Sequence, residues 1–67
     1  MGDQYTIEFI DGSVVNGLLL QQEKTNGYFF VDLTDAVIWA GKYGSKREFE
    51  DHWSNSQGVK QLARRLN

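Results

Sequence analysis

The chain has 67 residues, which is enough for one small domain and too few for two. Hydrophobic residues make up 40% of it and aromatic residues 13%, so the composition excludes a disordered chain and predicts a folded core. The net charge of −2 argues against a protein whose whole surface binds nucleic acid, although it allows a local basic patch.

The first predicted elements are two strands joined by a tight turn. Apolar and polar residues alternate from Tyr5 to Phe9, which is the period of a half-buried strand, and we place this strand at 4–10. Asp11-Gly12-Ser13 has the composition of a turn. Residues 14–22, rich in branched and apolar side chains, are predicted to form the second strand.

Two further strands are predicted at 28–33 and 36–40. Asn26-Gly27 precedes the first of them and indicates a hairpin, because both residue types tolerate positive φ. Thr34-Asp35 reads as a turn between the two strands, and Gly41 as the end of the second. The simplest topology is a four-stranded antiparallel meander.

Helical patterns follow this sheet. Ser45 and Glu48 have the spacing of a capping box, in which each side chain satisfies a free backbone N–H of the first turn, and they predict a helix at 46–54. Apolar residues at helical spacing predict a second helix at 57–66; they are Val59, Leu62, Ala63 and Leu66. The sequence therefore predicts a single α+β domain, a four-stranded antiparallel sheet followed by one or two C-terminal helices.

Neither catalysis nor a bound cofactor is expected from these residues. The one histidine, His52, lies on the first predicted helix away from any nucleophile, and the capping geometry engages the Ser45 hydroxyl with backbone N–H groups. With no cysteine and one histidine, a zinc site or disulfide is not expected. The carboxylates of Asp32 and Asp35 are too few for a calcium loop. We expect no enzyme, metal or cofactor.

The stretch from Gly41 to Ser45 allows two interpretations. It delivers flexible backbone to a helix N-terminus, where Lys42, Lys46 and Arg47 could help hold an anion. Glycines also serve the geometry of a corner between sheet and helix, and Glu48 opposes the positive field. We favour the structural corner.

A second basic group lies near the end of the chain. It consists of Lys60, Arg64 and Arg65, of which Lys60 and Arg64 are four residues apart and could contact phosphates from one face of the second predicted helix. Cations in the last turn of an ordinary helix also complement its dipole. We favour the ordinary terminal helix.

A protein partner is favoured by the surplus of aromatic residues and by the apolar face of the last predicted helix, which must be buried somewhere. The chain contains no proline, so its sheet edges lack that protection against pairing, and self-association is expected. The candidate partner-binding residues are Trp39, Tyr43, Trp53, Leu62 and Leu66.

The segment from Ile7 to Leu19, followed by Asn26 and an apolar strand, resembles the first motif of Sm-like proteins, which are small barrels of the SH3 type. That motif has a strand, an Asp-Gly turn, a second glycine five residues on, here Gly17, and an asparagine before the third strand. The resemblance implies a strongly bent, small-barrel-like sheet and RNA contacts at Asn26. This chain differs in placing its helical pattern after the fourth strand, so we take from the resemblance only the bent sheet.

Two functions are carried forward. The first is a small, non-catalytic, self-associating interaction module in the cytoplasm, without a membrane partner, that regulates or assists a partner protein, as accessory proteins of phages or mobile elements do. The alternative is a nucleic-acid-binding small barrel that stacks bases on aromatic rings. Its candidate contacts are Asn26, Lys42, Lys46, Arg47, Lys60, Arg64 and Arg65.

Overall fold

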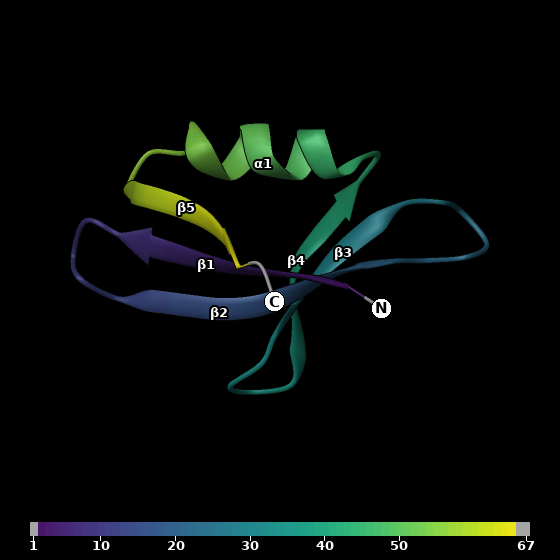
Figure 1. The fold of residues 1–67 in the computed structure, drawn as a ribbon, viewed down its shortest axis with the longest axis horizontal. Coiled ribbons are helices and arrows are strands. Elements are labelled where there is room, and N and C mark those ends of the chain that lie inside the picture. Colours follow the sequence, from purple (N-terminus) through teal and green to yellow (C-terminus); the bar gives the residue numbers. More distant parts are fainter. Residues whose placement is uncertain (1, 66–67) are drawn as a thin grey trace.

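The computed structural model describes residues 2–65. They form five strands and one helix (Figure 1). The elements are β1 (Asp3–Phe9), β2 (Val14–Gln21), β3 (Tyr28–Asp32), β4 (Val37–Tyr43), α1 (Lys46–Ser54) and β5 (Val59–Arg65). Within the described residues, no helix is long and apolar enough to cross a membrane.

All strands belong to one antiparallel sheet in the order β4-β3-β2-β1-β5. The predicted antiparallel sheet is therefore present, but it has a fifth strand, which returns to pair with β1. The helix α1 connects the two edge strands β4 and β5 and lies over one face of the sheet (Figure 1). Between residues 2 and 65, β4 and β5 do not pair with each other, so the sheet stays open.

The helix predicted at 57–66 is wrong, because residues 59–65 form strand β5. The reason is a β-bulge: Phe9 pairs with Val59, while the next residue of β1, Glu8, pairs with Gln61. The extra residue places Val59 and Leu62 on the same face of the sheet at a spacing of three. A spacing of three between apolar residues is typical of a helix, so the bulge gives this strand a helix-like sequence pattern.

The fourth strand is longer than predicted. Gly41 does not end it, since β4 continues to Tyr43, which pairs with Tyr28. Register shifts on both sides of Phe30 add extra residues to β4. These irregularities bend β4 and bring its last residues beside the start of α1.

The hairpin between β2 and β3 forms as predicted but with another turn geometry. Hydrogen bonds between Gln22 and Gly27 and between Asn26 and Gln22, at 2.8 and 2.9 Å, close a wider loop than an Asn-Gly turn. Only Asn26 of the pair adopts positive φ, at 57°. Asparagine tolerates this conformation better than most residues do.

The start of α1 agrees with the predicted cap. The Ser45 hydroxyl accepts a hydrogen bond from the Glu48 N–H at 3.1 Å. The Glu48 carboxylate accepts one from the N–H of Gly44 at 2.7 Å, one residue earlier than in a standard capping box. Both groups are engaged within the corner, which supports its structural interpretation.

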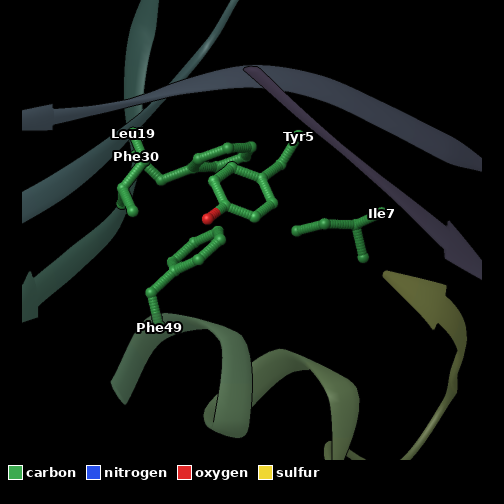
Figure 2. Packing of buried hydrophobic residues seen from close by; sticks show 5 residues of the cluster. All are labelled: Tyr5, Ile7, Leu19, Phe30 and Phe49. Carbon is green, nitrogen blue, oxygen red and sulfur yellow. The ribbon is translucent and has the colours of Figure 1, made fainter. Parts of the chain in front are cut away.

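The core lies between the sheet and α1 (Figure 2). Its fully buried side chains are Tyr5, Ile7, Leu19, Phe30 and Phe49. The ring centroid of Phe49 on α1 lies 5.0 Å from the ring centroids of Tyr5 and Phe30. Gly17 is required beneath Phe30, because a Cβ atom there would overlap the Phe30 ring and the Val31 carbonyl.

Candidate partner-binding surface

The face of the sheet turned away from α1 is apolar over its β4 half. Leu19 and Phe30 point into the core, so their neighbours along β2 and β3 point to the opposite face. There Leu18 pairs with Val31, and Val31 pairs with Ile38. We call this surface the outer patch; it consists of Leu18, Leu20, Phe29, Val31 and Ile38.

The same face is polar along β1. Its outward residues there are Gln4, Thr6 and Glu8, and the Thr6 hydroxyl donates a hydrogen bond to the Asn16 side chain at 2.7 Å. A sheet with one solvated face normally alternates in this way throughout. The outer patch therefore departs from what solvent exposure alone would favour, and Ile38 within it is 68% exposed.

The sequence predicted that the residues of the outer patch lie on strands, but it did not identify them as a candidate binding surface. Their signal lies in the unbroken apolar runs Leu18–Leu20 and Phe29–Val31, which lack the polar alternation of Tyr5–Phe9. A strand without alternation is apolar on both faces. Such a strand in an antiparallel sheet predicts a second buried face, which a partner can provide.

A hollow of about 470 Å³ adjoins the outer patch. It is lined by Gln21, Gln22, Phe29, Ile38, Gly41 and Lys42. The irregular part of β4 borders it, where Gly41 and Lys42 face the single residue Phe29 of β3. Its volume lies within the range of about 300–1,000 Å³ that is typical of ligand pockets.

Three of the predicted partner-binding residues lie together, but within the molecule's own packing. The Trp39 and Trp53 rings are 4.9 Å apart, and the Trp53 Nε1–H donates a hydrogen bond to the Tyr43 hydroxyl at 2.9 Å. Trp39 also packs edge-on against Phe30 of the core. All three are half-buried, so this aromatic cluster holds α1 against β4.

The other two predicted partner-binding residues lie apart from that cluster. Leu62 is on β5 opposite Ile7, where it packs against the core. Leu66 lies outside the described residues. Leu62 therefore belongs to the packing of β5, as expected for an inward side chain of a sheet.

Several of the predicted basic residues have acidic partners. Lys46 Nζ lies 2.8 Å from Asp3 Oδ2. Lys60 Nζ lies 3.6 Å from Glu8 Oε2, and Arg47 Nε lies 3.8 Å from Asp51 Oδ2. The hydrogen bond with Lys46 lowers the pKa of Asp3 below its ordinary value, and the same contact raises the pKa of Lys46. These pairs reduce the positive field available to an anion.

The remaining basic residues lie in different places. Lys42 lines the hollow. On β5, Arg64 pairs with Tyr5 on the α1 side of the sheet, and Arg65 pairs with Gln4 on the opposite side. Asn26 is exposed in the loop between β2 and β3. The described residues thus do not show these side chains gathered into one basic groove.

The two side chains considered as catalytic candidates, Ser45 and His52, make local contacts on α1. The Ser45 hydroxyl caps α1, and the His52 ring stacks edge-on at 4.8 Å from Trp53. In residues 2–65, no three histidine or carboxylate side chains come together as a metal site.

Comparisons of the chain with protein-family models, with curated proteins and with solved structures find no match.

Proposed function

We propose that this protein is a small non-catalytic interaction module that binds a partner protein through the outer patch. The observation that supports the proposal most is the apolar character of both sheet faces over β2, β3 and β4, with Ile38 68% exposed. The other four residues of the patch are half-buried. Contiguous apolar patches on the surface of a small protein are typical of interaction sites. By covering the patch, a partner would bury it as a second core.

A protein partner fits the surface better than a nucleic acid does. Apart from Lys42 at its margin, the outer patch consists of aliphatic and aromatic side chains, whereas nucleic-acid surfaces are polar and strongly basic. Lys46 is engaged by Asp3 at 2.8 Å, while the ion pairs of Arg47 and Lys60 are longer and exposed and reduce their charge only in part. The role we assign is regulatory or accessory: the module acts by occupying its partner.

The test compares two exposed isoleucines. Ile38→Lys places a charge in the outer patch, and Ile10→Lys is the matched control, because Ile10 is 74% exposed and lies in the turn after β1. Tagged wild type and both variants are used to capture proteins from an extract of the source cells. We expect a partner that is retained by wild type and Ile10→Lys and lost by Ile38→Lys.

Two outcomes contradict the proposal. One is a partner retained equally by all three proteins, which places the interface elsewhere. The other is retention of nucleic acid at low salt that falls steeply as salt rises and is unaffected by Ile38→Lys, which is the behaviour of phosphate contacts. Sedimentation of the three proteins shows whether the partner is a second copy, since wild type would then be dimeric and Ile38→Lys monomeric.

A further inference from the structure

We infer that the hollow beside β4 receives a large apolar side chain from an extended segment of the partner protein, next to an acidic residue that pairs with Lys42. This inference rests on the proposed function and specifies what the partner presents. Three observations support it: the lining of the hollow, the open space at Gly41, and the free edge of β4, which borders the hollow.

Part of the lining of the hollow suits an apolar group. Phe29 and Ile38 contribute the apolar side chains, and Gly41 keeps the site open, since a Cβ atom at Gly41 would meet nothing within 4 Å. A large apolar side chain bound there would be removed from water together with the side chains of Phe29 and Ile38. The hollow thus supplies the anchor pocket that energetically central residues of interfaces occupy.

The margin of the hollow carries one positive charge. Lys42 lines the hollow, and within residues 2–65 no carboxylate lies within 4 Å of its ammonium group, in contrast to Lys46 and Lys60. Gln21 and Gln22 also line the hollow. A side-chain amide can donate to and accept from a peptide backbone, and the Gln21 amide, which already donates to the Asn26 carbonyl at 3.4 Å, has a second N–H. These groups match an acidic residue beside the apolar anchor.

The hollow extends from β2 across β3 to the edge strand β4, and this free edge favours an extended segment over a helix. β4 ends the sheet, so one side of its backbone is free of a neighbouring strand among the described residues. Extended peptides add to such edges and place alternate side chains in adjoining pockets. A second copy of this chain fits less well, because antiparallel pairing of two β4 strands about Gly41 would place the two Lys42 side chains as diagonal neighbours on one face and would supply no acidic residue there.

The experiment uses a displayed library of random dodecapeptides, selected on immobilised wild-type protein. We expect the selected peptides to be enriched in aspartate or glutamate next to a large apolar residue. Gly41→Leu should weaken them about tenfold or more by filling the hollow, while the fold tolerates it. Lys42→Glu should weaken them about twofold to fivefold and favour lysine in place of the acid. Thermal unfolding confirms that both variants are folded.

The inference is overturned if the selected peptides show no acidic preference, or if Gly41→Leu binds them as tightly as wild type does. The cellular partner separates this failure from failure of the proposed function. A partner lost by Ile38→Lys but retained by Gly41→Leu and Lys42→Glu leaves the outer patch as the interface and removes the hollow from it. A dimer of wild type that Gly41→Leu dissociates would identify a second copy as the occupant and also contradict the inference.

Discussion

Tyr5 links the core to the helix through its hydroxyl group. The ring is fully buried, and the hydroxyl donates a hydrogen bond to the Glu50 carboxylate of α1 at 2.6 Å. Burial and this hydrogen bond raise the pKa of Tyr5 above its ordinary value of 10.0. The folded protein therefore keeps the Tyr5 proton at pH values where the unfolded chain releases it, so stability falls as pH rises above about 10.

Tyr5→Phe should lower the free energy of unfolding at neutral pH by about 1–3 kcal/mol, because it leaves the Glu50 carboxylate without its donor. The variant should also lose less stability than wild type when the pH is raised past about 10, since its titrating group is gone. Urea unfolding at both pH values measures these effects. Equal losses in the two proteins above pH 10 would show that the Tyr5 hydroxyl is not held as described.

At the scale of elements, β5 shows how the bulge decides the packing. With Val59 opposite Phe9 and Gln61 opposite Glu8, Lys60 is the extra residue. Deletion of Lys60 makes the strand regular and still leaves Leu62 opposite Ile7. In a helix the same deletion would rotate every following side chain by about 100° relative to Val59.

We therefore expect deletion of Lys60 to destabilise the protein less than Leu62→Ala does. Leu62→Ala should cost about 1–3 kcal/mol, because its half-buried side chain packs against the core. Gln61→Ala on the exposed face is the control and should change stability by less than about 0.5 kcal/mol. Denaturant unfolding gives the order; a Lys60 deletion that unfolds the protein would contradict the assignment of the bulge.

Features that depend on neighbouring residues are predicted from the sequence better than features that depend on long-range pairing. The cap at Ser45 and the hairpin at Asn26 depend on neighbouring residues, and their positions were predicted from those residues. The strand β5 depends on pairing with β1, fifty or more residues away, and its bulge produces a helical spacing. The outer patch also depends on register, because only pairing shows that Val31 and Ile38 share a face.

At the scale of the whole molecule, the chain forms a small open sheet with α1 covering one face (Figure 1). The register of the strands places the outer patch on the other face. The core between α1 and the sheet contains few fully buried side chains. Domains of this size gain little net stability from one core, typically about 3–5 kcal/mol. Covering the outer patch with the proposed partner would add a second buried layer, so such a partner should also stabilise the fold.

The most direct test of the outer patch is a methyl NMR titration of the labelled protein with its captured partner. We predict that the methyl signals of Leu18, Leu20, Val31 and Ile38 shift or broaden on binding. Those of Val59 and Leu62, which lie on the other face of the sheet, should remain unchanged. Changes confined to Val59, Leu62 and the indole signals of Trp39 and Trp53 would contradict the account, because they would place the partner on the α1 side.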